Sequence, residues 1–114
     1  GSSQVLYDIS NNRLSFGGGL TFNRTAVSTR HTASVSNYIL GITAVPTEIL
    51  FDATLFSDGQ GLVIKDESGA ANATNAITLV PSASQTIDGL STAIIESPYG
   101  SVFMYSDGTN WFIY

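Results

Sequence analysis

The sequence predicts an all-β protein, an antiparallel β-sandwich of the jelly-roll kind preceded by a short N-terminal β neck. No window places apolar residues at i, i+3, i+4 and i+7, so helical periodicity is missing. Apolar and polar residues alternate instead, in short runs rich in β-branched and aromatic residues. Turn-forming clusters separate these runs at intervals of about eight to twelve residues, which is typical of sandwiches and barrels.

Composition narrows the class of protein further. The 114-residue chain fits one domain with a modest core. A net charge of -5 with four Lys and Arg argues against binding to nucleic acid or to an anionic membrane. No apolar run approaches the roughly 20 residues that cross a bilayer, so membrane insertion is not expected. No cysteine is present, which excludes disulfides and thiolate chemistry.

The chain divides into three parts along its length. We expect residues 1–3 to be a cloning remnant. Residues 4–27 contain short strand–turn units with too little apolar volume to close a core, and they predict a neck. Residues 28–114 contain the longer strands and predict the sandwich head. Alternation in the neck involves Val5, Tyr7 and Ile9, then Leu14 and Phe16, then Leu20 and Phe22.

The head is expected to contain several strands in succession. Residues 48–56 place Ile49, Phe51, Ala53 and Leu55 on one face of a strand, although the register over 43–61 is not fixed by the sequence. Further strands are expected at 76–80, 91–97, 101–106 and 110–114. The pairs Asp88-Gly89 and Asp107-Gly108 predict tight turns, because Gly accepts a positive φ without steric cost.

The last two of these strands are apolar on both faces. A strand with one solvent-exposed face has alternating apolar and polar residues, and these two strands lack that alternation. One face is expected to fill the core, and the other must be covered either by the chain's own neck and loops or by a neighbouring subunit. We favour the subunit, because a core of this size is marginal. The candidates for core or oligomer interface are Phe103, Tyr105, Trp111, Phe112, Ile113 and Tyr114.

The segment 62–114 resembles the C-terminal region of tail-fibre and other virion proteins of tailed bacteriophages. The resemblance is carried by Ile64-Lys65-Asp66 with Ser68-Gly69, by 75–78 (NAIT), by 86–89 (TIDG), by 97–102 (SPYGSV) and by 106–111 (SDGTNW). It implies a virion location, a homotrimer, an upstream fibre or shaft region in the parent protein, and contact with a host-cell surface receptor, either a glycan or a protein. The Pro46 region departs from the expected pattern.

Candidate receptor contacts are the loop residues Tyr38, Tyr99, Asn72 and Asn75, since glycans bind to aromatic faces and to amide groups. The alternative for Tyr99 is packing at a corner of the sandwich. For the whole domain, the alternatives to attachment are a trimerisation or capping module without a ligand, and a non-catalytic fragment of a carbohydrate-active virion enzyme.

Enzymatic activity is not expected. His31 is the only histidine, and no G-x-S-x-G elbow accompanies it. A structural or solvated role for His31 is favoured, with a metal site on a three-fold axis as the alternative. Asp66 and Glu67 are adjacent on one loop, which is more typical of a solvated turn than of a pair of catalytic acids. No cofactor or metal is predicted.

Overall fold

The protein is all-β, as the sequence predicts. The computed structural model describes residues 5–8 and 10–114, and the expected cloning remnant at 1–3 lies outside these residues. The N-terminal strands are β1 (Val5–Asp8), β2 (Arg13–Phe16), β3 (Arg24–Val27), β4 (His31–Thr32), β5 (Ile39–Ile42) and β6 (Thr47–Phe51). After the 3-10 helix η1 (Ala53–Leu55) come β7 (Gly61–Asp66), β8 (Ile77–Pro81), β9 (Ala93–Ile95), β10 (Ser101–Ser106) and β11 (Trp111–Ile113).

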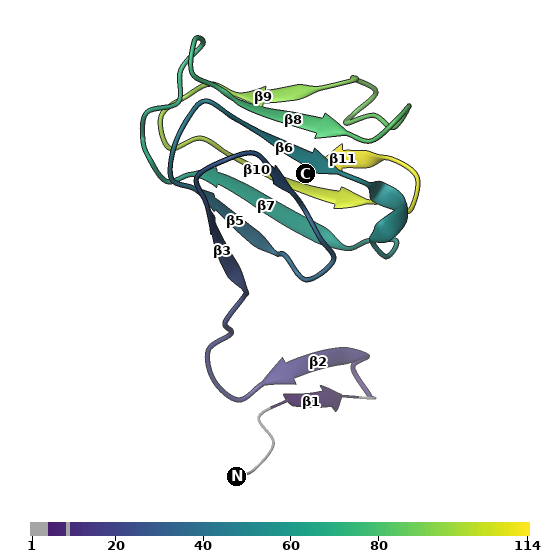
Figure 1. Cartoon of the computed structure of the whole chain (residues 1–114). Coiled ribbons are helices and arrows are strands. Elements are labelled where there is room, and N and C mark those ends of the chain that lie inside the picture. Colours follow the sequence, from purple (N-terminus) through teal and green to yellow (C-terminus); the bar gives the residue numbers. More distant parts are fainter. Residues whose placement is uncertain (1–4, 9) are drawn as a thin grey trace.

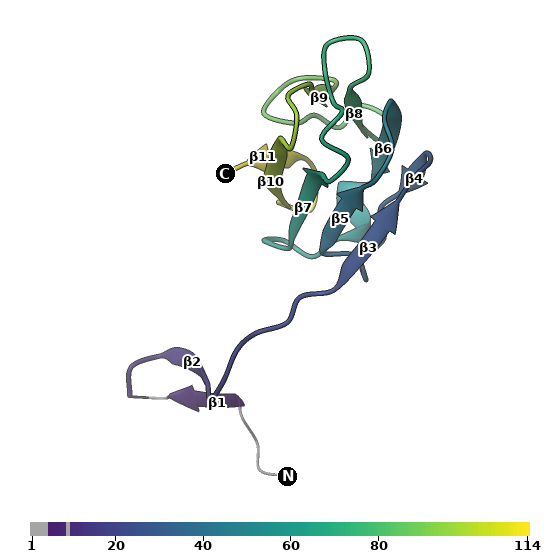
Figure 2. The same ribbon diagram turned by 90° about the vertical axis from the view of Figure 1, so that its left-hand side faces the viewer.

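The head consists of two sheets packed face to face. The five-stranded sheet has the order β11-β10-β7-β5-β3, and the four-stranded sheet has the order β4-β6-β8-β9. Figure 2 shows them as two layers, with β11 and β3 at opposite edges of the first layer. The sandwich architecture brings the inward side chains of both layers into one core.

The sheets are mixed rather than antiparallel, which corrects the predicted jelly roll. From β3 to β8, successive strands alternate between the two sheets, and the pairs β3–β5, β5–β7, β4–β6 and β6–β8 are parallel. Short connections cross from one layer to the other, so every second strand returns to the same sheet in the same direction (Figure 1). The chain therefore winds as a flattened coil. Among the described strands, the antiparallel pairs are β1–β2, β7–β10, β8–β9 and β10–β11.

Two predicted boundaries move in the structure. Residues 24–27 were expected in the neck, but they form β3, the edge strand of the five-stranded sheet. The head therefore begins at Arg24, because β3 pairs with β5 in full register. The strand expected over 48–56 ends at Phe51. There the Asp52 side chain accepts the backbone N–H of Thr54 and caps η1, which leaves Leu55 exposed.

Alternation along each strand builds the core. In β7 the residues Leu62, Ile64 and Asp66 are buried, while their neighbours are only half-buried. In β10 Met104 is buried and Phe103 is exposed. The largest buried side chain is Trp111, which contacts Phe51 and Phe56 with ring centroids 5.5 and 5.0 Å apart. Strand β11 therefore closes the core with its first residue.

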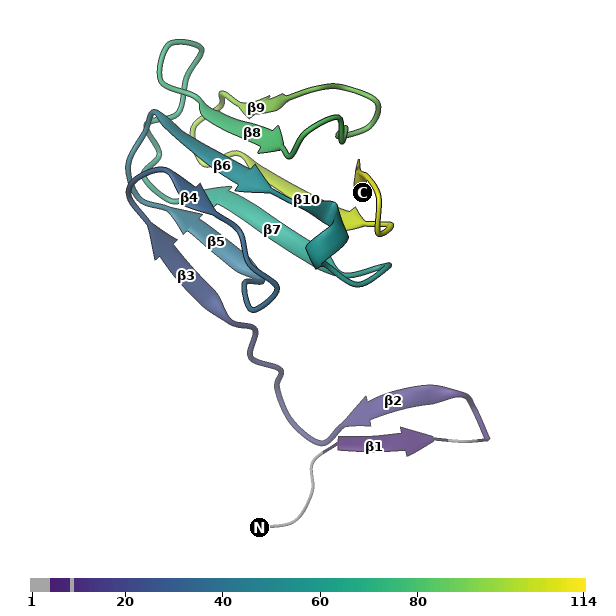
Figure 3. The same cartoon turned by 45° about the vertical axis from the view of Figure 1, so that its right-hand side comes forward.

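The β1–β2 hairpin lies apart from the head. An extended segment, residues 17–23, joins it to β3 (Figure 3). The side chains of Leu14, Phe16 and Leu20 are exposed on this part of the chain. Across the described residues, no helix has the length and apolar character that spanning a membrane requires.

Candidate functional site

The outer side of the five-stranded sheet carries a continuous group of aromatic rings. We call this the aromatic face, and it consists of Phe22, Tyr38, Phe103, Tyr105, Phe112 and Tyr114. Phe103 and Tyr105 alternate with the buried residues of β10, so they point away from the core. Phe112 and Tyr114 stand in the same relation to Trp111 on β11. Alternation thus commits one side of both strands to the core and the other to the surface.

Each ring of the aromatic face contacts the next. Phe103 lies between Tyr38 and Tyr114, with ring centroids 6.2 and 4.2 Å away. Tyr105 contacts Tyr114 at 4.9 Å and Phe112 at 5.7 Å. Phe22, in the segment before β3, contacts Tyr38 at 4.6 Å. These separations are those of favourable aromatic pairs. The row therefore extends from β11 across the sheet to the point where the chain enters the head.

The chain itself leaves much of this row uncovered. Phe22, Phe103, Phe112 and Tyr114 are 49%, 41%, 36% and 70% exposed. Only Phe22 comes from the part of the chain that precedes the head strands. The chain therefore covers the aromatic face only in part, and an exposed apolar group of this kind typically marks an interaction surface.

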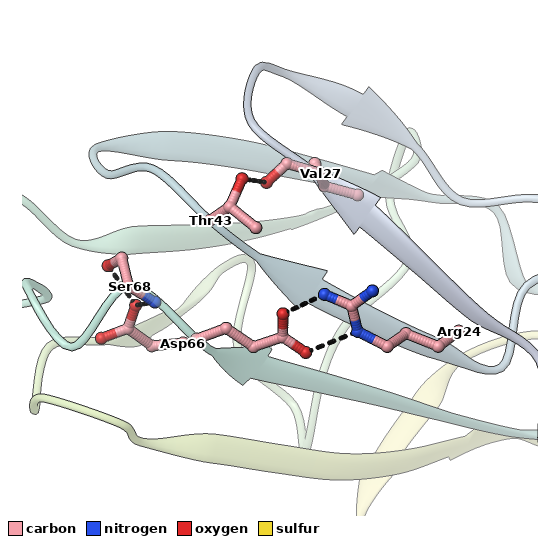
Figure 4. Close-up of polar contacts among 6 residues, drawn as sticks. Arg24, Val27, Thr43, Asp66 and Ser68 are labelled. Atoms are coloured by element: carbon pink, nitrogen blue, oxygen red, sulfur yellow. Dashed lines mark hydrogen bonds and ion pairs between the residues drawn. The ribbon is translucent and has the colours of Figure 1, made fainter.

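Polar groups occupy the other part of the same sheet surface. Arg24 donates from Nε to a carboxylate oxygen of Glu67 at 2.9 Å and forms a second hydrogen bond through Nη2 (Figure 4). Gly41 makes room for this pair, because a Cβ at that position would overlap the Glu67 carboxylate. The hydrogen bond from Arg24 lowers the pKa of Glu67. The aromatic face thus has a polar border.

The six residues predicted for the core or the oligomer interface lie in different places in the structure. Trp111 belongs to the core, and its indole Nε1 has no hydrogen-bond partner among the described residues. Ile113 lies at the sheet edge, partly exposed, and its backbone N–H donates to Asp88 Oδ1 at 3.1 Å. The remaining four candidates, which are Phe103, Tyr105, Phe112 and Tyr114, lie on the aromatic face.

A second feature, centred on Asp66, was missed by the sequence reasoning. The sequence placed Asp66 in a solvated turn, but the residue is fully buried. Oδ1 accepts the Ser68 backbone N–H and hydroxyl (Figure 4). Oδ2 accepts the backbone N–H groups of Ala71 and Tyr99, both at 3.1 Å. Burial raises the pKa of Asp66, and these hydrogen bonds outweigh it, so the pKa is lowered overall. The alternation Leu62, Ile64, Asp66 was the signal that could have identified it.

The receptor-contact candidates do not converge on one site. Tyr38 belongs to the aromatic face. Asn72 forms a turn, since its Oδ1 accepts the backbone N–H groups of Thr74 and Asn75. Tyr99 is 60% exposed beside Gly69, in a turn held by Asp66. Asn72, Asn75 and Tyr99 therefore lie on loops near Asp66, whereas Tyr38 lies elsewhere.

The predicted Asp-Gly pairs form turns of two kinds. Asp88 and Gly89 have φ values of 49° and 82° between Ile87 and Leu90, which are hydrogen-bonded to each other in both directions. This is the arrangement of a two-residue type I′ turn. Asp107 instead accepts the backbone N–H groups of Thr109 and Asn110, and Gly108 has a φ of 92°. The last hairpin is therefore joined by a longer loop.

His31 has a structural environment. It is half-buried at the start of β4, and its Nε2 lies 3.1 Å from Asn37 Oδ1. Asn37 Oδ1 also accepts the Ser34 backbone N–H, so His31 belongs to a local hydrogen-bond network. Within residues 5–8 and 10–114, no three His, Asp or Glu side chains are grouped so that they could hold a metal ion.

A shallow hollow of about 440 Å³ lies where the β3–β4 turn approaches β6 and β8. The side chains of Arg30 and Glu48 form an ion pair at 3.4 Å along it, and both are largely exposed. Thr47 also lines it, and its buried hydroxyl has no hydrogen-bond partner within residues 5–8 and 10–114. The described residues that line this hollow include no aromatic ring, which distinguishes it from the aromatic face.

No protein-family model matches the chain, and no curated protein matches its sequence.

Proposed function

We propose that this chain is the β-sandwich head of a trimeric virion appendage, such as a tail fibre or spike, that attaches the particle to a host-cell surface receptor. The aromatic face is the observation that carries the proposal. Association with other copies of the chain would bury its exposed rings. The resemblance of residues 62–114 to bacteriophage fibre heads supports both the trimer and the virion location.

Another copy of the same chain is the occupant that best fits the aromatic face. Among the described residues, the exposed apolar side chains include those of the aromatic face and those of Leu14, Phe16 and Leu20 in the neck. A two-stranded hairpin is marginally stable in water by itself. Figure 2 shows the β1–β2 hairpin on the side of the five-stranded sheet that faces away from the four-stranded sheet, and the aromatic face lies on this same side. Association of copies about a symmetry axis would cover the two surfaces together.

The composition of the surface fits a stable interface. Full burial of one large apolar side chain contributes about 1.5–3 kcal/mol, so several partly exposed rings in each of three copies give a substantial total. The Arg24–Glu67 pair borders the aromatic rings, as polar groups border the apolar centre of protein interfaces. Tyr and Phe are also among the residues enriched at such centres.

A trimer of heads would carry three receptor-binding sites on one rigid assembly, which favours attachment to a cell surface. The neck enters at the start of β3, so the loops that follow β3 and β7 lie at the opposite end of these parallel strands, which we call the far end. Three copies of a weak site at the far end gain avidity without a strong individual contact. The alternative without a ligand, a trimerisation or capping module, would use the aromatic face alone.

The test is the molar mass in solution, measured by light scattering at micromolar concentration. We expect about three times the chain mass of 12.0 kDa. The double variant Phe103→Ser with Tyr114→Ser should shift the mass toward one chain. Ile94→Ser is the matched control, since Ile94 is 51% exposed on a strand of the other sheet and should leave the mass unchanged. A parent protein that stays at 12.0 kDa would overturn the proposal.

A further inference from the structure

The turn before β10 holds a tyrosine in a conformation that favours glycine. Gly100 donates its backbone N–H to Ser97 O at 2.9 Å, which closes a turn over Ser97, Pro98, Tyr99 and Gly100. Pro98 occupies the second position, and Tyr99 in the third has a φ of 59°. This is the pattern of a type II turn, whose third position requires a positive φ and normally holds Gly or Asn. A residue with a Cβ is disfavoured there.

Two hydrogen bonds hold the backbone of Tyr99 in this conformation. Its backbone N–H donates to the buried carboxylate of Asp66 at 3.1 Å. Its carbonyl oxygen accepts a hydrogen bond from Lys65 Nζ. Strained residues persist where the surrounding structure over-determines them, and they cluster at functional sites. The two hydrogen bonds therefore stabilise the Tyr99 side chain at a position where glycine would have a lower conformational energy.

The Tyr99 ring is held by a contact at its phenol end, and the rest of the side chain is exposed to solvent. The phenol end of Tyr99 lies against Gly69, where a Cβ would overlap the ring and where φ is 72°. The side chain is nevertheless 60% exposed. A tyrosine ring fixed in this way offers a large amphipathic contact surface with little side-chain entropy to lose on binding. Residues of this type frequently dominate the energetics of binding sites.

We infer that Tyr99 is the principal receptor contact of the head, and that it binds the ring of an uncharged sugar. This inference rests on the proposed attachment function. The turn lies at the far end, because β7 ends at Asp66 and β10 begins at Ser101. The two charged side chains that contact the turn are engaged within the chain, since Lys65 Nζ is bound to the Tyr99 carbonyl and Asp66 accepts backbone N–H groups. An exposed, uncharged aromatic ring suits a polyhydroxylated ligand with an apolar C–H face.

The test compares Tyr99→Gly with the parent protein on an array of neutral and acidic oligosaccharides, with thermal unfolding measured in parallel. Gly suits the positive φ, so we expect the Tm to fall by no more than about 4 °C, while binding falls at least tenfold. Tyr99→Phe should retain binding within a few-fold. Ala83→Gly is the matched control: Ala83 also has a positive φ, of 50°, in an exposed turn, and glycine there should leave binding unchanged.

The outcomes separate this inference from the attachment function. A parent protein that binds a neutral sugar while Tyr99→Gly binds equally well overturns the role of Tyr99 alone. A fall in Tm well beyond about 4 °C for Tyr99→Gly also overturns it, because the ring would then be a packing group. A trimeric parent that binds no sugar on the array overturns both the sugar contact and the glycan form of the attachment function.

Discussion

The carboxylate of Asp66 accepts the backbone N–H of Tyr99 at 3.1 Å, although the two residues are 33 positions apart in the sequence. The same carboxylate accepts N–H groups from Ser68 and Ala71, so it joins the loop after β7 to the turn before β10. A buried carboxylate that accepts this many hydrogen bonds from two loops is a structural centre for the far end. Its removal should affect both loops together.

We expect Asp66→Asn to lower the free energy of unfolding by about 2–3 kcal/mol. The amide has nearly the same shape, but its NH₂ group would face backbone N–H groups and leave buried donors unpaired. Urea unfolding measures the change. Asp107→Asn is the control, because Asp107 is exposed and its Oδ1 acceptor role survives in asparagine. Equal losses for the two variants would contradict the structural role of Asp66.

Acid should destabilise the protein through Asp66 and Glu67. The pKa of each is lowered in the folded state, by the hydrogen bonds of Asp66 that outweigh its burial and by Arg24 in the case of Glu67. Their stabilising contribution is complete above the unfolded values of about 4, and it is lost as the pH falls through the lower folded values. Urea midpoints should therefore be level from pH 7 to about pH 5 and then decrease. The Asp66→Asn variant should show a shallower decrease, and a curve parallel to that of the parent would exclude Asp66 as a source.

Two adjacent residues of β11 should behave in opposite ways. Trp111→Ala leaves a cavity against Phe51 and Phe56, and we expect a loss of about 3–5 kcal/mol in thermal or urea unfolding. Phe112→Ser changes only the aromatic face, and we expect it to lower the molar mass while the far-ultraviolet circular dichroism of the head is retained. If Phe112→Ser unfolds the head, or leaves the mass unchanged, the separation of core and interface on this strand is wrong.

Removal of residues 1–20 should leave the head folded. The β1 and β2 strands make their extensive contacts with each other, and the core residues all lie between Val27 and Trp111. The near-ultraviolet circular dichroism of Trp111 should therefore be retained in the shortened chain. Loss of this signal would show that the neck contributes to the fold of the head.

The sequence predicts the β class and the two faces of the last strands because alternation is a local property. It cannot predict the parallel pairs, since a turn residue marks where the chain reverses but not whether it reverses within one sheet or across to the other. Pro46 and its neighbours, for example, connect β5 in one sheet to β6 in the other. Expecting hairpins at such turns led to the antiparallel jelly roll.

Prediction from the sequence has the same limit for the functional residues. Asp66 was expected in a solvated turn because it lies beside Glu67 at the start of a polar loop, yet the alternation from Leu62 and Ile64 directs it inward. Its partner Tyr99 could not be paired with it from the sequence, because the hydrogen bond depends on the β7–β10 register. The left-handed conformation of Tyr99 was likewise invisible, since the sequence places a tyrosine where this turn normally has glycine.

The coil formed by β3 to β8 has a consequence for the order of assembly. Arg24 pairs with Ile39, a separation of 39 − 24 = 15 positions, whereas Lys65 pairs with Ser101, a separation of 101 − 65 = 36. Closing the shorter loops costs less entropy, so we expect the coil to form before β10 and β11 dock. These late strands carry Trp111 inward and Phe112 outward. The part of the aromatic face on β10 and β11 would therefore form only when the core of the same copy is complete. This order would keep partly folded chains from associating with one another.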